Sequence, residues 1–339
     1  MGADPDASRV VMAVRVGLPV DRVGGGVVES VARGALSGIG NTPLVELVRV
    51  VPPGSARVMV KLEFANPTGS MKDRMARSAI EGAASDGRLQ PGDTVVEYTA
   101  GTTGVSLAFV CAALGYGLHI VFSDAFSREK FLMMRAFGAV VEEIPSDGGQ
   151  INEALIKSMI ARAGELACEP GRWWCDQLNN HDAIRGYAAL GDEIWLQTGG
   201  RIDAFVQSVA TAHSIHGAAD AIRAHGAELH VTAVEPAESP ILSGGPTGSH
   251  RIEGIGIGFI PPLWEPHKVD EIQMVSSGDA IAMARRLTRE EGLFAGVSSG
   301  ANVVAALRVA ERLGPDATVV TILCDSGLRY LSTELYRDA

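Results

Sequence analysis

The chain has little cysteine and no excess of positive charge, and each shortage excludes a class of protein. Its four cysteines are widely spaced and form no CxxC pair, which argues against a disulfide framework and a zinc site. Its 40 acidic residues outnumber 29 basic ones, so the formal net charge is -11. This balance lacks the footprint of a protein that binds nucleic acid or an anionic membrane. We expect no metal, no nucleic-acid or membrane partner, and a cytoplasmic location.

Long hydrophobic runs are also scarce. The most apolar stretch, residues 104–122, approaches the roughly 20 residues of a membrane-spanning helix. Gly115, Gly117 and His119 interrupt it, so we interpret it as a buried helix followed by a strand. Residues 1–35 lack the apolar core and cleavage site of a secretory signal, and we interpret them as an N-terminal extension.

Short β-branched runs alternate with longer alanine-rich helical patterns from residue 57 onward. This alternation predicts βαβ units and an α/β fold. With 339 residues, of which 46% are hydrophobic, we expect two domains, each a mostly parallel twisted sheet flanked by helices, at 36–180 and 181–339. Strands are predicted at 57–62, 94–98, 119–122, 140–144, 204–209, 230–234 and 318–323. Helices are predicted at 72–86, 103–114, 128–137, 151–163, 215–225, 278–291 and 300–313.

Lys72 occupies an unusual position for a lysine. Within residues 66–74 (NPTGSMKDR), Pro67 and Gly69 favour a tight turn, and Ser70 can cap the helix that follows. Lys72 would then lie in the first helical turn, where the helix dipole disfavours a cation and lowers the pKa of the amine. A neutral amine is what Schiff-base chemistry requires. On these residues alone, an exposed lysine after a turn is the alternative.

Further turns join an expected strand to an expected helix, which is where α/β proteins bind ligands. Residues 99–104 (TAGTTG) gather amides and hydroxyls that suit a carboxylate or a phosphate. Residues 209–217 (VATAHSIHG) place His213 at a helix N-terminus, where free amides bind phosphate. The alternative is that His213 and His216 merely face solvent. Ser298, in GVSSG at 296–300, is also compatible with a simple helix cap.

Together these motifs resemble the fold type II pyridoxal-phosphate enzymes, in the branch of cysteine synthase and cystathionine β-synthase. The resemblance covers nearly all of residues 39–333. Its motifs are IGNTPLVEL at 39–47, KLEFANPTGSMKDR at 61–74, TxGxTG at 99–104, GIGIGF at 254–259, GVSSGA at 296–301 and DSGLRYLST at 325–333. It implies a fold like that of the tryptophan synthase β-subunit, pyridoxal 5'-phosphate as cofactor, and a homodimer.

The resemblance also implies roles for single residues. Lys72 is the catalytic residue, which carries the cofactor as an internal aldimine and shuttles the α-proton. The residues implied to bind the cofactor are Lys72, Thr102, Ala210, Thr211, Ala212, His213, Ser214 and Ser298. Those implied to bind the substrate are Thr99, Ala100, Gly101, Thr103, Gln177 and Gly254. A neutral Ser298 hydroxyl at the pyridine nitrogen does not enforce a protonated ring, which favours β-elimination over deeper carbanion chemistry.

The implied reaction is β-replacement on an O-activated L-serine, such as an acetyl or phospho ester. Lys72 removes the α-proton, the leaving group departs, and a small nucleophile adds to the resulting aminoacrylate. Two alternatives stay open. One is elimination without a second substrate, as in dehydratases or desulfhydrases, although such dehydratases typically show a shorter Ser-Phe-Lys-x-Arg segment. The other is a non-catalytic homologue, against which Lys72, Gln177 and Ser298 argue.

Three departures from the family pattern bear on the substrate. Ala100 stands where related cysteine synthases have a serine, and Thr102 replaces an asparagine that contacts the ring hydroxyl. Residues 210–214 (ATAHS) replace the phosphate loop GTGGT, and each added Cβ crowds the approach to phosphate. His213 could supply a charged hydrogen bond or point into the active site. These departures suggest a specialised branch with a different nucleophile or acceptor.

Overall fold

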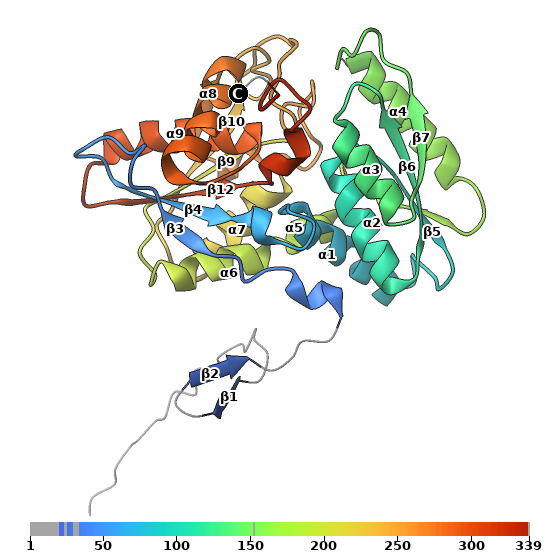
Figure 1. Ribbon diagram of the computed structural model, residues 1–339, viewed down its shortest axis with the longest axis horizontal. Coiled ribbons are helices and arrows are strands. Elements are labelled where there is room, and N and C mark those ends of the chain that lie inside the picture. The colour runs from blue at the N-terminus through green and yellow to red at the C-terminus, as the bar shows by residue number, and fades with distance from the viewer. Residues whose placement is uncertain (1–19, 24–25, 30–33, 152, 338–339) are drawn as a thin grey trace, which may run out of the picture.

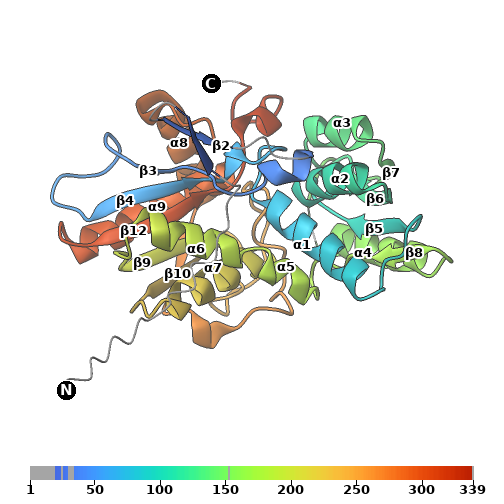
Figure 2. The same ribbon diagram turned by 90° about the horizontal axis from the view of Figure 1, so that it is seen from below.

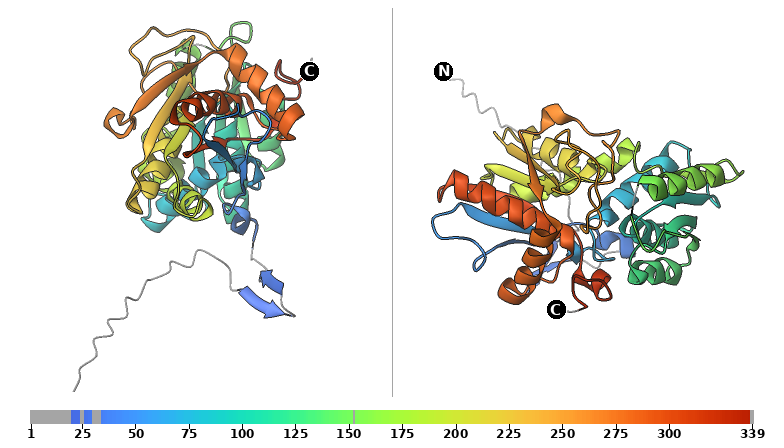
Figure 3. Two further views of the ribbon diagram at one scale, coloured as in Figure 1. Left: turned by 90° about the vertical axis from the view of Figure 1, so that its left-hand side faces the viewer. Right: turned by 90° about the horizontal axis from the view of Figure 1, so that it is seen from above.

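The computed structural model describes residues 20–23, 26–29, 34–151 and 153–337 (Figure 1). Two sheets of mostly parallel strands form the body of the described chain, each with helices packed on it. Figures 1 and 3 show the four-stranded sheet and its helices beside the larger six-stranded sheet. The predicted α/β architecture with parallel sheets is therefore confirmed.

The six-stranded sheet has the order β11-β10-β9-β12-β4-β3. Its neighbours pair in parallel except β3 and β4, which are antiparallel. The bounds are β3 Leu44–Glu46, β4 Arg57–Leu62, β9 Ala204–Ser208, β10 His230–Pro236, β11 Glu271–Val275 and β12 Thr318–Leu323. Side chains alternate between its faces, as the period of a strand requires. Val206 of β9 packs in the core with α8 and α9, whereas Phe205 packs in the core with α7.

The helices of this larger body are short to moderate in length. They are α5 His181–Arg185, α6 Ala188–Gln197, α7 His213–Ala224, α8 Ser277–Arg286 and α9 Val297–Leu313. Helix α1 Lys72–Ser85 packs against both bodies, with Met75 in the core of the larger sheet and Ile80 in the core of the smaller one. The helix predicted at 278–291 continues as a π-helix, η4 Leu287–Glu291, after α8 ends. Glycines allow close helix contacts here. A Cβ on Gly217 of α7 would lie 2.4 Å from the Ile184 carbonyl oxygen of α5.

The four-stranded sheet is parallel throughout, with the order β7-β6-β5-β8. Its strands are β5 Thr94–Tyr98, β6 Gly117–Ser123, β7 Val140–Ile144 and β8 Arg172–Trp174. Its helices are α2 Thr102–Leu114, α3 Arg128–Ala136 and α4 Glu153–Ala167. Figure 2 shows α2 and α3 on one side of this sheet and α4 on the other. The apolar stretch from residue 104 onward is α2 and β6 of this body, as predicted.

Four short 3-10 helices complete the described body, and two strands lie within the extension. The 3-10 helices are η1 Ala35–Gly38, η2 Glu63–Ala65, η3 Pro266–Lys268 and η5 Gly327–Tyr330. Strands β1 Val20–Val23 and β2 Gly26–Glu29 pair antiparallel within the predicted extension. Most other residues of the extension, 1–19, 24–25 and 30–33, lie outside the described residues. Across the described ranges, no helix is both long enough and apolar enough to cross a membrane.

The division of the chain between the sheets differs from the simple cut expected at residue 180. Strands β3 and β4 precede that point, yet β4 pairs in parallel with β12, with Arg57 opposite Thr318. The six-stranded sheet therefore takes strands from both ends of the described body, and the four-stranded sheet takes a middle segment. The turns after β4, β5 and β9 carry most of the residues predicted for the site, whereas Gln177 follows β8, Gly254 lies in the loop after β10, and Ser298 lies in the first turn of α9.

Candidate active site

Lys72 begins α1 directly after a turn that is hydrogen-bonded to the end of β12. The turn places Gly69 at φ +79°, in the left-handed region that favours glycine. Met71 donates its amide hydrogen to the Cys324 carbonyl oxygen at 2.9 Å, and Ser326 donates to the Gly69 carbonyl oxygen at 2.9 Å. Ser70 is not the N-cap residue, but its hydroxyl accepts from the Lys72 amide at 3.1 Å. The position of Lys72 therefore depends on contacts between the turn that follows β4 and the residues that follow β12, which lie far apart in the sequence.

The environment of Lys72 favours the neutral amine. Burial is the largest cause that lowers the pKa of Lys72, and the nearby Cys324 and Asp325 groups oppose it. The pKa of Lys72 is lowered, as we predicted from its place at a helix N-terminus. The largest cause is burial. An exposed lysine after a turn, the alternative left open by the sequence, does not describe this side chain. A neutral amine near physiological pH can act as a nucleophile and as a base.

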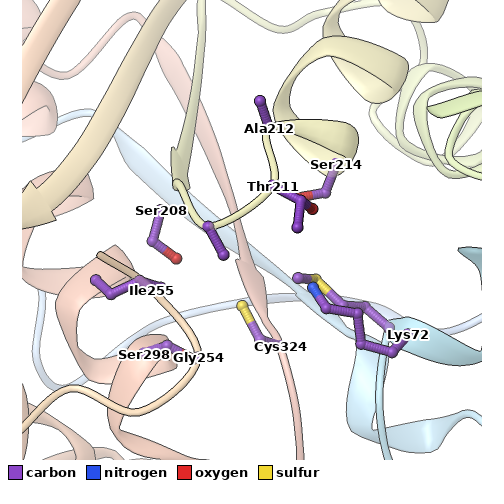
Figure 4. Close-up of a pocket in the computed structure, with 11 residues that line it drawn as sticks. Lys72, Ser208, Thr211, Ala212, Ser214, Gly254, Ile255, Ser298 and Cys324 are labelled. Atoms are coloured by element: carbon purple, nitrogen blue, oxygen red, sulfur yellow. The ribbon is translucent and has the colours of Figure 1, made fainter. Parts of the chain in front are cut away.

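A cavity beside Lys72 collects residues from five segments of the chain (Figure 4). In Figure 4 the Lys72 amine points into it, toward the Cys324 sulfur. Seven residues predicted from the sequence line it, namely Lys72, Ala210, Thr211, Ala212, Ser214, Gly254 and Ser298. Four others were not predicted, namely Met71, Ser208, Ile255 and Cys324. Ser208 and Cys324 stand where strands β9 and β12 end, and that position was the signal that could have identified them.

The loop from β9 into α7 presents the N-terminus of a helix to this cavity. Ala212 is the N-cap residue with φ +68°, a left-handed conformation that costs a residue with a Cβ roughly 1 kcal/mol. Such strain is retained where surrounding contacts require it, often at functional sites. The Ser214 hydroxyl accepts from Gln207 Nε2 at 3.0 Å, and the first amides of α7 have no helical acceptor. His213 and His216 are both buried, so neither faces solvent.

Ser298 lies in the first turn of α9, opposite this loop. Ser298 is buried and lines the cavity, and its hydroxyl donates a hydrogen bond to the Cys324 sulfur. The neighbouring Ser299 hydroxyl accepts from the Cys324 amide at 2.9 Å, which fixes the end of β12 against α9. Burial raises the pKa of the Cys324 thiol to about 11, so it stays protonated. Ser298 is therefore held in place as a neutral hydrogen-bonding group.

The turn from β5 into α2 is built around Gly101, at φ +116°. The Thr99 hydroxyl accepts from the Gly101 amide at 2.9 Å and so serves the turn itself. Thr103 donates its hydroxyl hydrogen to Gln177 Oε1 at 2.9 Å, and Gln177 Nε2 donates to the Tyr98 carbonyl oxygen at 2.8 Å. The structure thus brings Thr103 and Gln177 together, 74 residues apart in sequence.

Thr102 and Ala100 take different places in this turn. The Thr102 hydroxyl lies 3.5 Å from Asp325 Oδ2, at the long limit of a hydrogen bond, so it connects the turn to the end of β12. The Ala100 methyl is partly buried and packs against the core of the four-stranded sheet. Neither residue lines the cavity beside Lys72.

A buried ion pair between Lys130 and Glu253 lies near this turn, and we did not predict it from the sequence. Lys130 of α3 is 1% exposed, and its Nζ lies 2.6 Å from Glu253 Oε2 and 4.4 Å from the centre of the Tyr330 ring. Its stem also lies against Gly101, because a Cβ built there would come within 2.5 Å of the Lys130 Cδ. Lys130 lies in the first turn of α3 directly after an arginine and a glutamate, so in the sequence it resembles a solvated charge, and only its tertiary contacts show that it is buried.

These groups fit a cofactor that carries an aldehyde, a ring nitrogen and a phosphate. Lys72 offers an amine whose pKa is lowered by burial, Ser298 offers a hydroxyl, and the N-terminus of α7 offers free amides. The Ser208 hydroxyl is buried and has no hydrogen-bond partner within the described ranges, which leaves it available to a bound group. No group of three or more metal-ligating side chains occurs in the part of the chain that the structure describes.

Comparison with known proteins agrees with this geometry. Residues 35–325 match the family model described as pyridoxal-phosphate dependent enzyme. A cysteine synthase of Staphylococcus aureus is 41% identical over 300 residues, which cover 88% of this chain and 95% of the relative. The chain therefore belongs to the pyridoxal-phosphate-dependent enzymes of the cysteine synthase type, and its cofactor is pyridoxal phosphate, as predicted.

Solved structures of similar proteins cover several reactions. The crystal structure of a cysteine synthase from Entamoeba histolytica is 35% identical, with a TM-score of 0.84 and 91% of each chain covered. An O-ureido-L-serine synthase is 35% identical, with a TM-score of 0.85 over 91% of this chain and 96% of that one. An O-acetylserine-dependent cystathionine β-synthase from Helicobacter pylori is 34% identical, with a TM-score of 0.84 over 91% and 99%. The products in the names of these similar proteins thus differ.

Proposed function

We propose that this enzyme catalyses β-replacement on an O-activated L-serine, such as the acetyl or phospho ester, with a small nucleophile. The observation that carries the proposal is the convergence of the Lys72 amine, the Ser298 hydroxyl and the α7 N-terminus on one cavity, beside the turn that holds Gln177. Similarity to cysteine synthases and to an O-acetylserine-dependent enzyme supports the choice of substrate.

Bound pyridoxal phosphate supplies the electron sink that stabilises negative charge at the α-carbon of the amino acid. Lys72 would hold the cofactor, the α7 N-terminus with Thr211 and Ser214 would hold its phosphate, and Ser298 its ring nitrogen. Burial lowers the pKa of Lys72, which favours the neutral amine that would remove the α-proton and return it. The leaving group departs from the β-carbon, and the nucleophile then adds to that carbon.

The turn at residues 99–103 and Gln177 would bind the substrate carboxylate. Helix N-terminal amides and dipole favour an anion there. Thr103 fixes the Gln177 side chain from one side and the Tyr98 carbonyl fixes it from the other, so the amide is oriented before substrate binds. Gly254, which lines the cavity opposite Ala210, would border the substrate pocket.

The test is to mix the purified holoenzyme with O-acetylserine, O-phosphoserine and other activated β-substituted amino acids, and to measure release of acetate, phosphate or the corresponding group. We expect consumption of at least one, and Lys72→Ala should lower turnover by at least about 10³-fold because the amine acts as nucleophile and base. Lys157→Ala is the control, since Lys157 is exposed and pairs only with Glu153 in α4 among the described contacts. Turnover retained by Lys72→Ala, or no substrate consumed, contradicts the proposal.

Product analysis separates replacement from elimination. Pyruvate and ammonia formed without an added nucleophile, with no substituted product when one is supplied, would assign the enzyme to elimination instead. We also propose that the enzyme is a cytoplasmic homodimer, which the family resemblance supports. Light scattering coupled to gel filtration of the full chain measures its mass directly, and a monomer at micromolar concentration contradicts this part.

A further inference from the structure

A pair of fully buried amide side chains, Gln207 and Asn302, contacts the wall of the cavity beside Lys72. Gln207 belongs to β9 and Asn302 to α9, and both are 0% exposed. Asn302 Nδ2 donates to Gln207 Oε1 at 2.9 Å, so the pair connects the six-stranded sheet to the helix. A buried polar pair is stable only when its hydrogen bonds are satisfied, and it then imposes directions on the groups that it contacts.

Backbone groups fix the orientation of the Asn302 side chain. The Ser208 amide can only donate and lies 2.8 Å from Asn302 Oδ1, whereas the Ile322 carbonyl oxygen can only accept and lies 2.8 Å from Asn302 Nδ2. Exchanging the oxygen and nitrogen of this side chain would break both hydrogen bonds. The second hydrogen of Asn302 Nδ2 is therefore directed at Gln207, which meets it with its oxygen.

The orientation of Gln207 in turn sets the direction of the Ser214 hydroxyl. Because Gln207 Oε1 faces Asn302, its Nε2 faces Ser214 Oγ at 3.0 Å and donates to it. A serine hydroxyl has one hydrogen, and an oxygen that accepts from Gln207 keeps that hydrogen for another partner. The contacts of the described residues give this hydroxyl no other hydrogen bond. Ser214 lines the cavity (Figure 4), so a bound group there can accept the hydrogen.

The other hydroxyl of this loop has no such constraint. Thr211 Oγ1 lies 3.0 Å from His213 Nδ1, and that nitrogen donates or accepts according to the tautomer of the ring. A fully ionised phosphate carries only acceptor oxygens, so it binds hydroxyls that donate. Of these two hydroxyls, that of Ser214 is the one whose direction is anchored to the backbone, through Gln207 and Asn302.

We propose that Gln207 and Asn302 are positioning residues for the cofactor, which hold the Ser214 hydroxyl as a donor to the phosphate of pyridoxal phosphate. The inference rests on the proposed function, which places that phosphate at the N-terminus of α7. A hydroxyl held in this direction before binding loses less rotational freedom when the phosphate arrives, so the phosphate is bound more tightly. Gln207 and Asn302 do not line the cavity, and they act through Ser214.

Binding of two ligands to the full chain freed of its cofactor tests this role. Pyridoxal phosphate and pyridoxal share the aldehyde and the ring, but only the first carries a phosphate. Gln207→Met is close in volume and removes the donor, so it should raise Kd for pyridoxal phosphate about fivefold and leave Kd for pyridoxal unchanged. Equal affinity of the parent for the two ligands, or an equal change for both in Gln207→Met, overturns the inference.

A double-mutant cycle measures whether Gln207 acts through the Ser214 hydroxyl. Ser214→Ala should raise Kd for pyridoxal phosphate about tenfold, and adding Gln207→Met to it should raise Kd no further. Losses that multiply would mean that Gln207 acts by another route, which contradicts the proposal. Asn302→Ala removes the group that orients Gln207 and gives a second test if Gln207→Met does not fold. It should weaken binding of pyridoxal phosphate but not of pyridoxal, and any other result counts against the pair.

Phosphorus NMR of the holoenzyme gives a readout that does not depend on turnover. The signal of the bound phosphate should shift in Gln207→Met and keep its place in the control Thr321→Val, which removes a buried hydroxyl that donates to the Val206 carbonyl oxygen at 2.7 Å. An unshifted signal in Gln207→Met, or an equal shift in both variants, overturns the inference. A parent enzyme that consumes no activated serine would instead refute the proposed function, so the two failures are distinct.

Discussion

Glu97 is a carboxyl group buried at the end of β5, directly before the substrate turn. It is 0% exposed, and its two oxygens accept hydrogen bonds from the amides of Tyr98 and Gln177, both at 2.9 Å. Burial raises the pKa of Glu97 to about 8, and these two amides oppose the rise. The carboxyl group therefore ties the Gln177 segment to the strand that leads into the turn.

The raised pKa predicts how stability depends on pH. The unfolded chain loses the Glu97 proton near its ordinary pKa, whereas the folded chain keeps it until about pH 8. The contribution of this group is therefore full below the unfolded pKa and is lost as pH rises through the folded one, by at most about 1.4 kcal/mol per pH unit. Urea unfolding of Glu97→Gln should lack this decline. Glu81→Gln, at an exposed position of α1, is the control, and equal slopes in Glu97→Gln and the parent would contradict the prediction.

Gly101 occupies a position where any side chain would meet both an unfavourable backbone conformation and a close neighbour. Gly101→Ala would place a Cβ at φ +116° and within 2.5 Å of the Lys130 Cδ. We expect the free energy of unfolding to fall by about 1–3 kcal/mol and KM for the activated serine to rise about tenfold or more, because the turn is displaced. Gly138→Ala is a matched control, since φ is +91° there and no atom lies within 4 Å. The prediction is wrong if both variants behave alike.

At the scale of elements, α3 connects the four-stranded sheet to segments that belong with the larger sheet. Besides the Lys130–Glu253 ion pair, the Ser127 hydroxyl donates to the Arg329 carbonyl oxygen at 2.7 Å. Glu129 accepts from the Ser332 hydroxyl at 2.8 Å. These contacts hold the two sheets together on the side where Gly101 and Thr102 lie.

The ion pair should be strongly coupled because both partners are largely buried. Lys130→Met or Glu253→Gln alone should lower the free energy of unfolding by about 3 kcal/mol, since each leaves the other group without its partner. The double variant should lose less than the sum, by at least about 1 kcal/mol. The exposed pair Lys157–Glu153, also 2.6 Å apart, should couple by no more than about 0.5 kcal/mol in the same measurement. Additive losses at Lys130 and Glu253 would refute this.

Prediction of elements from the sequence succeeded where the local pattern was strong. Strands β4, β5, β7 and β12 have the predicted bounds, because each contains at least two β-branched residues, and β5 and β12 are buried on both faces. The short strands β3 and β8 and the five-residue helix α5 were not predicted, because so few residues carry no clear period. The edge strand β11 contains Glu271 and Gln273, which resemble a loop when pairing is unknown.

For the site, motifs predicted the residues of the turns but not what surrounds them. Lys72, Ser298 and the loop at 210–214 stand on one cavity because each follows or faces a strand end. Lys130 and Glu253 come from a helix and a loop with no such signal, and they meet across 123 residues of sequence. Charge states were also beyond the sequence, because burial decides the pKa of His213 and Glu97.

At the scale of the whole molecule, chain order and spatial order diverge. Strands alternate with helices on either side of residue 180, and this pattern predicts a domain boundary there. Pairing between β4 and β12 spans most of the chain, and hydrophobic pattern says nothing of such distant partners. The middle segment that forms the four-stranded sheet is therefore inserted between strands of the larger one (Figure 1).

The hydrogen bonds between the Lys72 turn and the end of β12 have a consequence for how the chain folds during synthesis. Domains form during synthesis from the N-terminus onward, yet β4 and the Lys72 turn find their partners in residues 318–326. A ribosome-bound chain lacks these partners until residues 318–326 have emerged. The four-stranded sheet, whose strands all lie between residues 94 and 174, can assemble earlier. The Lys72 turn therefore reaches its place beside Cys324 only after the strands of the smaller sheet have been made.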